Sequence, residues 1–203
     1  MSLSPELEYL MRSLSCVTYN GAQHSDIQIN ESDSLAKLKV VNIKAGNGDW
    51  FCFSPDEGRK CRNIHSKSNM VIMSPLLTIG EGFNHHCACD AVIFIKAVIF
   101  IKKDNGIVII YIDLKSDNPT GYSPQFKSAR QFIRYLIGLH EEFQKSKLSI
   151  IEERYIILHS GKRSFLNKST TIKKDKIGKT YPDKAFKREV KNGDTLYLKE
   201  FLS

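Results

Sequence analysis

Two neighbouring runs of β-branched and aromatic residues constrain the fold of this chain more than any other feature. The first spans residues 89–101 and the second residues 107–114, and the polar link between them ends in Asn105-Gly106. Branched side chains pack well on a pleated surface, so such runs favour strands. An Asn-Gly pair between two strands is typical of a tight hairpin turn. The sequence therefore predicts two long antiparallel strands that lie side by side.

A repeat lies inside the first of these strands. The hexapeptide Ala-Val-Ile-Phe-Ile-Lys occurs at residues 91–96 and again at residues 97–102. Side chains alternate between the two faces of a strand, so lengthening it by an even number of residues keeps every side chain on its original face. The repeat is compatible with a tolerated duplication, and a bulge in the strand is the alternative.

The remaining elements predict a mixed fold. Helices are expected after Ser4-Pro5-Glu6 and from Ser123 to about Lys145, where apolar residues recur at helical spacing. Further strands are expected at residues 38–43, 50–53, 154–159 and 195–201, and residues 20–34 are expected to be irregular. This order indicates an α/β or α+β fold, with a central mixed β-sheet flanked by helices. With 203 residues and no convincing linker, a single domain over residues 1–203 is expected.

Three polar residues lie at the ends of the predicted hairpin strands. Asp90 opens the first strand, whereas Asp113 and Lys115 close the second. An antiparallel hairpin places the start of one strand beside the end of the other, and residues two apart share a face. We therefore expect two carboxylates and one ammonium group within reach of one another at one edge of the sheet.

This trio suits the hydrolysis of a phosphodiester. Paired carboxylates offer the hard oxygen ligands that Mg²⁺ or Mn²⁺ prefers. Such a metal neutralises charge on the scissile phosphate and lowers the pKa of a bound water, while a lysine stabilises the developing negative charge. The alternative is a solvated strand end at Asp113 and Lys115, with Asp90 capping a turn.

The chain resembles the core of the PD-(D/E)xK nuclease superfamily in three segments: Cys89-Asp90-Ala91-Val92-Ile93-Phe94, Ile110-Tyr111-Ile112-Asp113-Leu114-Lys115-Ser116 and Pro124-Gln125-Phe126. The resemblance covers residues 89–139 and implies a restriction-endonuclease-like core. It implies that Asp90, Asp113 and the Leu114 carbonyl bind the metal. It also implies Lys115 as the catalytic lysine and Gln125 as a supporting residue.

The chain departs from the family pattern at two points. Cys89 replaces the proline that names the motif, and the spacing between Asp90 and Asp113 is long, although removing one copy of the hexapeptide would bring it closer to the usual range. Many members add an acid from the first helix. Here that acid would be Glu6 or Glu8, although no motif selects either.

The charge of the chain favours a polyanionic partner. Its net charge is +8, and its most basic region spans residues 161–191. The residues predicted to bind nucleic acid are Lys127, Lys162, Arg163, Lys173 and Lys174, and a solvated surface loop is the alternative for the basic region. The leading hypothesis is a divalent-metal-dependent nuclease in restriction, repair or defence, with DNA favoured over RNA. A catalytically inactive nucleic-acid-binding module and a protein-interaction subunit are the alternatives.

Three other patterns compete with this hypothesis. A zinc site would use His85, His86, Cys87 and Cys89, but these residues lack a C-x-x-C knuckle. Thiol chemistry at Cys87 or Cys89 would need a neighbouring histidine on the same face, whereas adjacent strand residues point to opposite faces. Asp56 is a rival for the first acid, but its Ser-Pro-Asp-Glu setting favours a turn.

The location of the protein follows from what the sequence lacks. Lys96, Lys102 and Lys103 interrupt the most hydrophobic region, so no stretch is long enough to span a bilayer. The N-terminal segment has no basic stretch followed by an apolar run. We expect a cytoplasmic protein without a membrane partner, whose five cysteines are reduced. The oligomeric state stays open, and a homo-oligomer is compatible with the sequence.

Overall fold

The structure of the protein, a computed structural model, describes residues 3–23, 25–31, 33–59, 73–74, 76–77, 82–97, 106–117, 119–161 and 180–202. The α-helices are α1 (Pro5–Arg12), α2 (Pro55–Arg59) and α3 (Ser123–Gln144), and a 3-10 helix, η1, spans Leu198–Phe201. The strands are β1 (Thr18–Ala22), β2 (Ile27–Asn30), β3 (Val40–Lys44), β4 (Trp50–Ser54), β5 (Ala91–Ala97), β6 (Gly106–Lys115), β7 (Ser149–His159), β8 (Phe186–Glu189) and β9 (Thr195–Tyr197). These elements form a mixed α/β fold, as predicted.

The predicted hairpin forms the centre of a six-stranded mixed sheet. The strand order is β1-β4-β5-β6-β7-β8, antiparallel from β1 to β6 and parallel from β6 to β8. β5 and β6 pair in continuous register from Ala91 opposite Ile112 to Ala97 opposite Gly106. The first copy of the hexapeptide therefore lies in a regular strand without a bulge. Residues 98–102 of the second copy lie outside the described residues.

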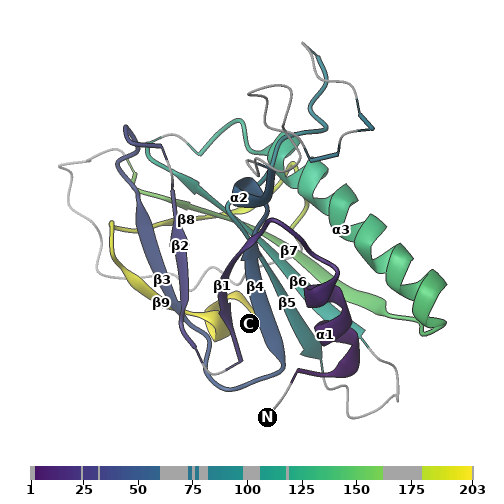
Figure 1. The fold of residues 1–203 in the computed structure, drawn as a ribbon. Coiled ribbons are helices and arrows are strands. Elements are labelled where there is room, and N and C mark those ends of the chain that lie inside the picture. Colours follow the sequence, from purple (N-terminus) through teal and green to yellow (C-terminus); the bar gives the residue numbers. More distant parts are fainter. Residues whose placement is uncertain are drawn as a thin grey trace.

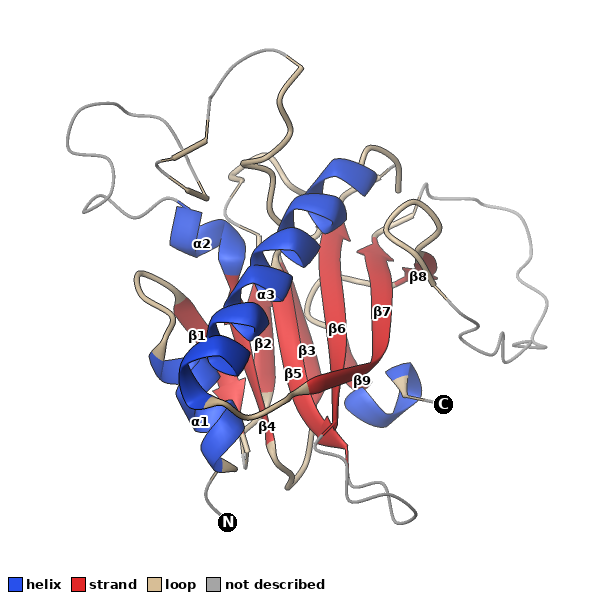
Figure 2. Ribbon diagram, turned by 90° about the vertical axis from the view of Figure 1, so that its right-hand side faces the viewer, coloured by secondary structure: helices blue, strands red, loops and turns tan. Residues whose placement is uncertain are grey.

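The sheet is covered by helices on one face and by a second sheet on the other (Figures 1 and 2). α1 and α3 pack on the first face through a core that includes Phe53, Phe94 and Tyr111. The other face packs on a three-stranded sheet of order β2-β3-β9. The prediction of flanking helices is correct for one face only. On the other face, a strand takes the place of the expected helix. Ile27 and Ile29 of β2 are buried and alternate with exposed residues.

α3 carries the chain from β6 to β7, and this crossover makes the two strands parallel. Pro124 lies in its first turn, and Lys145 ends the helix in the left-handed conformation at φ 50°. The residues that it buries recur at helical spacing: Phe126, Ala129, Ile133, Leu136, Ile137 and His140. Because β7 and β8 both run parallel to β6, the carboxyl ends of all three strands meet at the same end of the sheet.

Three segments differ from their predicted structures. Residues 198–201, expected to continue the last strand, form the 3-10 helix η1, so β9 ends at Tyr197. Residues 20–34, expected to be irregular, include the end of β1 and all of β2. β2 has only four residues and is buried by long-range contacts that local patterns do not reveal. The Ser-Pro-Asp-Glu segment contains the last residue of β4 and the start of α2 rather than a simple turn. Of the basic region, residues 162–179 lie outside the described residues, and β8 lies near its end.

The oxidation state of the cysteines differs from the expected one. Cys16 is disulfide-bonded, so the expectation that all five cysteines are reduced is wrong for this residue. Cys52, Cys87 and Cys89 are free thiols. Disulfide pairing depends on proximity in space, which the spacing of cysteines does not reveal.

None of the helices in the described part of the chain combines the length and the hydropathy that a membrane crossing requires.

Candidate active site

Asp90 and Asp113 meet at the end of the β5–β6 hairpin. Ala91 pairs with Ile112, so the next position along each strand brings Asp90 opposite Asp113. The backbone N–H of Leu114 donates a hydrogen bond to Oδ2 of Asp90, at 2.5 Å. Asp90 is 9% exposed and Asp113 is 1% exposed. Two carboxylates therefore lie side by side at the edge of the buried core.

Lys115 connects this acidic pair to α3. Its Nζ lies 2.8 Å from Oδ2 of Asp113 and donates a hydrogen bond to Oε1 of Gln125, at 3.1 Å. Gln125 belongs to the first turn of α3, so the crossover helix places it beside the strand end. The Lys115 side chain is 21% exposed. Its ammonium group therefore has two partners, and the side chain keeps partial contact with solvent.

Burial makes the acidic pair unfavourable in its ionised form. Burial raises the pKa of Asp113 to about 6, with the Lys115 ammonium opposing the rise and the charges of Glu31 and Asp56 adding to it. Burial also raises the pKa of Asp90 well above its usual range. The charge of Asp113 adds to that rise, whereas the Leu114 N–H opposes it. A cation bound between the two carboxylates would relieve both the burial cost and the repulsion.

The donor set fits a hard divalent cation. Asp90, Asp113 and the Leu114 carbonyl are oxygen donors at one place, and Mg²⁺ typically binds to one or two carboxylates plus water and substrate oxygens. Within the described ranges, no cluster of three or more His, Cys, Asp or Glu side chains is arranged to hold a metal. Water, substrate or backbone oxygens would therefore complete the coordination shell.

The first helix does not supply the additional acid. Glu6 forms an ion pair with Lys96 at 3.0 Å, and Lys96 lies at the opposite end of β5 from Asp90. Glu8 pairs with Arg12 at 3.8 Å on the exposed side of α1.

Two other acids act on the site instead. Asp56 lies in α2, directly after β4, and Glu31 directly follows β2. The loop after Glu31 is joined to the end of β6, because the Lys37 N–H donates to Oγ of Ser116 at 2.8 Å and the Lys37 ammonium pairs with Asp117. The charges of Glu31 and Asp56 raise the pKa of both Asp90 and Asp113. The Pro55-Asp56 dipeptide was a signal for one of them, whereas no sequence signal marks Glu31.

The residues of the alternative zinc site have separate partners. Nδ1 of His86 accepts a hydrogen bond from the Met73 N–H at 2.9 Å, and the His85 carbonyl accepts one from the Ser128 hydroxyl at 2.5 Å. The buried Cys89 thiol donates to the Ala91 carbonyl at 3.5 Å. Burial raises the pKa of Cys89 well above its usual range, and the nearby Asp113 adds to this effect. Cys89 is therefore a protonated thiol, unsuited to nucleophilic chemistry.

His159 joins the site from β7 although no sequence motif marks it. The parallel register pairs it with Lys115, and the Ser160 N–H donates to the Lys115 carbonyl at 3.1 Å. The strand end was predicted at residue 159. The pairing of that end with Lys115 follows only from the crossover through α3.

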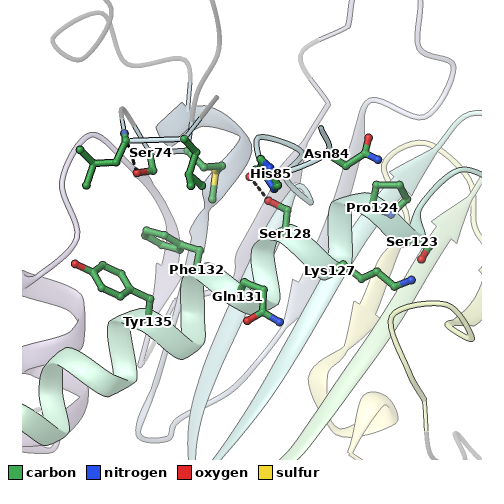
Figure 3. Close-up of a pocket in the computed structure, with 13 residues that line it drawn as sticks. Ser74, Asn84, His85, Ser123, Pro124, Lys127, Ser128, Gln131, Phe132 and Tyr135 are labelled. Carbon is green, nitrogen blue, oxygen red and sulfur yellow. Dashed lines mark hydrogen bonds between the residues drawn. The ribbon is translucent and has the colours of Figure 1, made fainter. Parts of the chain in front are cut away.

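Lys127 lies on the exposed side of α3, on the wall of a cavity of about 760 Å³ (Figure 3). The cavity is lined by α3 and by the segment that carries Asn84 and His85, which the Ser128–His85 hydrogen bond joins, and Tyr135 also lines it. The other residues predicted to bind nucleic acid, Lys162, Arg163, Lys173 and Lys174, lie outside the described residues.

In comparisons with known proteins, no family model, no curated protein and no solved structure matches this chain.

The pKa of Asp113 predicts how the stability of the metal-free protein depends on pH. Its folded-state pKa of about 6 lies above the ordinary value of 3.8, so the folded state binds this proton more tightly than the unfolded state does. Below about pH 4 the Asp113 carboxyl is protonated and its burial does not lower the free energy of unfolding. As pH rises through 6 the carboxyl ionises in the folded state, and the stabilisation present at low pH is lost. We expect Asp113→Asn to be more stable relative to the parent protein at pH 7 than at pH 4.5. Urea denaturation in EDTA at both pH values measures this difference, and a difference independent of pH would contradict it.

Proposed function

We propose that this protein is a metal-dependent nuclease that hydrolyses phosphodiester bonds, with Asp90, Asp113, Lys115 and Gln125 as its active site. One observation carries the proposal. The Lys115 ammonium lies 2.8 Å from a buried carboxylate and 3.1 Å from the Gln125 side chain, beside a second buried carboxylate. Two buried acids with raised pKa values form a cation site, and an adjacent open lysine is suited to bind an anion.

The order of the elements around the site supports membership of the PD-(D/E)xK superfamily. Asp90 precedes one strand of a hairpin, the Asp-Leu-Lys triplet ends the other, and Gln125 lies in the helix that follows. That helix leads to a strand parallel to the triplet strand. The sequence resemblance and the spatial arrangement are thus mutually consistent.

Each group has a distinct role in the proposed reaction. Asp90 and Asp113 would hold Mg²⁺ or Mn²⁺, together with the Leu114 carbonyl. When bound, the metal would neutralise charge on the scissile phosphate and lower the pKa of a water molecule. Lys115 would donate hydrogen bonds to the oxygen on which negative charge develops. Gln125 positions the Lys115 ammonium, and the Leu114 N–H holds the Asp90 carboxylate in place.

The substrate we propose is nucleic acid, with DNA as the first candidate. A chain with a net charge of +8 attracts polyanions at low ionic strength. RNA is the natural comparison substrate, because the described active-site groups would contact phosphate oxygens that both polymers share. Roles in restriction, repair or defence are each compatible with this activity.

Metal dependence tests the proposal directly. Supercoiled plasmid, linear duplex and single-stranded DNA, and RNA, should be cleaved with Mg²⁺ or Mn²⁺ and left intact in EDTA. Binding of Mn²⁺ should also raise the melting temperature, because a ligand present at 100 times its Kd stabilises the folded state by about 2.7 kcal/mol. Thermal denaturation with increasing Mn²⁺ measures this shift without substrate.

The control for the Mn²⁺ titration is Asp113→Asn, which removes one of the two proposed carboxylate ligands. Its melting temperature should respond to Mn²⁺ far less than that of the parent protein. Equal Mn²⁺ shifts in both proteins, or cleavage that persists in EDTA, would overturn the assignment of the metal site.

A further inference from the structure

Polar side chains continue from the proposed active site across the ends of the next two strands. Lys115 of β6 pairs with His159 of β7, and His159 pairs with Glu189 of β8. Paired residues of neighbouring strands point to the same face of a sheet. These side chains therefore lie on the face that α3 covers, in one row that starts at the proposed cleavage site.

Lys187 extends this row. It pairs with Ile157, two residues before His159, and its Nζ lies 5.4 Å from the centre of the Tyr122 ring, over that ring. Tyr122 immediately precedes α3, so this contact places the Lys187 ammonium on the same face as Gln125 and Lys115. The Lys187 side chain is exposed. Its charge faces solvent beside the site.

His159 has a hydrogen-bonding group that the described fold does not use. Its backbone carbonyl accepts a hydrogen bond from the Val190 N–H at 2.8 Å, which fixes the strand end. Its Nδ1 is buried and has no hydrogen-bond partner among the described residues. Burial lowers the pKa of the imidazole, with the Glu189 charge opposing this effect and the Lys187 charge adding to it. A neutral imidazole still carries one N–H, and because Nδ1 is buried, Nε2 of this half-buried ring is the nitrogen that would donate to a phosphate oxygen.

Glu189 is the one acid in this row, and its side chain packs toward the turn after β7. A Cβ on Gly161 would lie 2.7 Å from Cδ of Glu189, and Gly161 has a φ of +70°. The left-handed backbone conformation favours glycine at this position, and the absence of a side chain leaves room for the Glu189 carboxylate. The Glu189 carboxylate therefore lies against the turn at Gly161, whereas the Lys187 ammonium lies over the Tyr122 ring, next to the start of α3.

We propose that His159 and Lys187 bind a phosphate of the polynucleotide next to the scissile one. The strand that is cleaved would then run across the carboxyl ends of β6, β7 and β8. Neighbouring strands are about 4.8 Å apart, so β8 lies about 10 Å from β6, a distance on the scale of one to two nucleotide steps. The His159 N–H would orient this phosphate through a directional hydrogen bond, and the Lys187 ammonium would attract it through its positive charge. The inference rests on the proposed nuclease function.

Binding measured against salt concentration tests the role of Lys187. A labelled single-stranded DNA oligonucleotide would be titrated by fluorescence anisotropy in EDTA, so that no cleavage occurs. Removing one phosphate contact should reduce the slope of log K against log salt concentration by about 0.7. Lys187→Met should show this change and bind several-fold more weakly at low salt. Glu189→Gln, which removes a neighbouring negative charge, should bind more tightly.

Lys199 provides a matched control. It is exposed and its Nζ lies 5.5 Å from the centre of the Tyr197 ring, but it belongs to η1, which packs on the other face of the sheet. Lys199→Met removes the same charge and the same kind of ring contact. It should leave both the affinity and the salt slope unchanged. Equal effects of Lys187→Met and Lys199→Met would overturn the proposal.

The cleavage rate tests the role of His159. His159→Phe keeps a ring of similar shape without an N–H, and it should lower kcat/KM on the oligonucleotide by roughly 10-fold, the size expected for one lost hydrogen bond to a charged group. His159→Gln restores a donor and should recover part of the rate. Circular dichroism establishes that each variant is folded.

The outcomes separate this inference from the proposed function. Normal cleavage and binding by His159→Phe and Lys187→Met, alongside an inactive Asp113→Asn, would overturn the phosphate position and leave the nuclease assignment intact. A parent protein that neither binds nor cleaves nucleic acid would overturn both.

Discussion

Replacing Lys115 by methionine should reduce kcat/KM for DNA cleavage by roughly 10²–10³-fold, the loss typical of removing one group that stabilises transition-state charge. Methionine retains much of the length of the side chain but cannot donate to an oxygen. In the described structure, the ammonium of Lys115 is held 2.8 Å from Asp113 and 3.1 Å from Gln125. A plasmid-nicking assay and a discontinuous assay on a short labelled duplex would measure the loss.

Lys96 provides a matched control for this substitution. It lies in β5, its side chain is 13% exposed against 21% for Lys115, and it forms an ion pair with Glu6 at 3.0 Å. It is at the opposite end of the hairpin. Lys96→Met should therefore cost a similar amount of stability and leave cleavage near the parent rate. If the two methionine variants cleave equally well, Lys115 has no role in catalysis.

Gln125 should have a smaller effect than Lys115, because it acts through the lysine. Gln125→Ala removes the acceptor at 3.1 Å but leaves the ion pair with Asp113. A loss of about 10-fold, the equivalent of about 1.4 kcal/mol, is expected in the same assays. A larger loss than that of Lys115→Met would contradict the assignment of Gln125 as a positioning residue.

Asp90→Asn should make the metal-free protein more stable while abolishing cleavage. The substitution removes a charge that is buried beside Asp113, and the asparagine carbonyl can still accept the Leu114 N–H. Because burial and the neighbouring Asp113 disfavour the charged form of Asp90, we expect Asp90→Asn to unfold at a higher urea concentration and a higher temperature than the parent protein at pH 7.5.

Loss of cleavage is expected because Asp90 is one of the two proposed carboxylate ligands of the metal. A stabilising substitution that removes activity is typical of functional sites, where like charges are held together for a ligand. Urea denaturation in EDTA measures the gain in stability, and the plasmid assay with Mn²⁺ measures the loss of activity.

Asp194 serves as the matched control for Asp90→Asn. Its Oδ2 accepts the Lys191 N–H at 2.7 Å, so it also binds a backbone amide, but it lies in an exposed turn away from Asp113. Asp194→Asn should neither raise stability nor change cleavage. A destabilised Asp90→Asn protein, or one that cleaves at the parent rate, would show that the acidic pair is structural.

Much of the centre of the molecule was predictable from local sequence. β5, β6 and α3 are long elements whose residue types and spacing agree with their structures, so each could be assigned without tertiary information. The hairpin alone brings Asp90, Asp113 and Lys115 to one end of the sheet. These predictions succeeded because contacts between neighbours in sequence determine them.

Other features depended on contacts between distant segments. β2 is a four-residue strand buried by a second sheet, and that sheet occupies the face where helices were expected. Glu31 reaches the site because the loop between β2 and β3 is joined to the end of β6. A pattern of side chains along the chain carries no information about such neighbours.

The sequence by itself determined which chemical groups stand at the end of the hairpin, because the alternation of a strand and the geometry of an antiparallel turn are local properties. Only the tertiary structure decided how those groups are held and which others join them. The Leu114 N–H fixes Asp90, the start of α3 places Gln125 on Lys115, and the parallel crossover aligns His159 with the same end. Burial then raises the pKa values of the two acids, because low-dielectric surroundings and like charges arise only when the chain is packed.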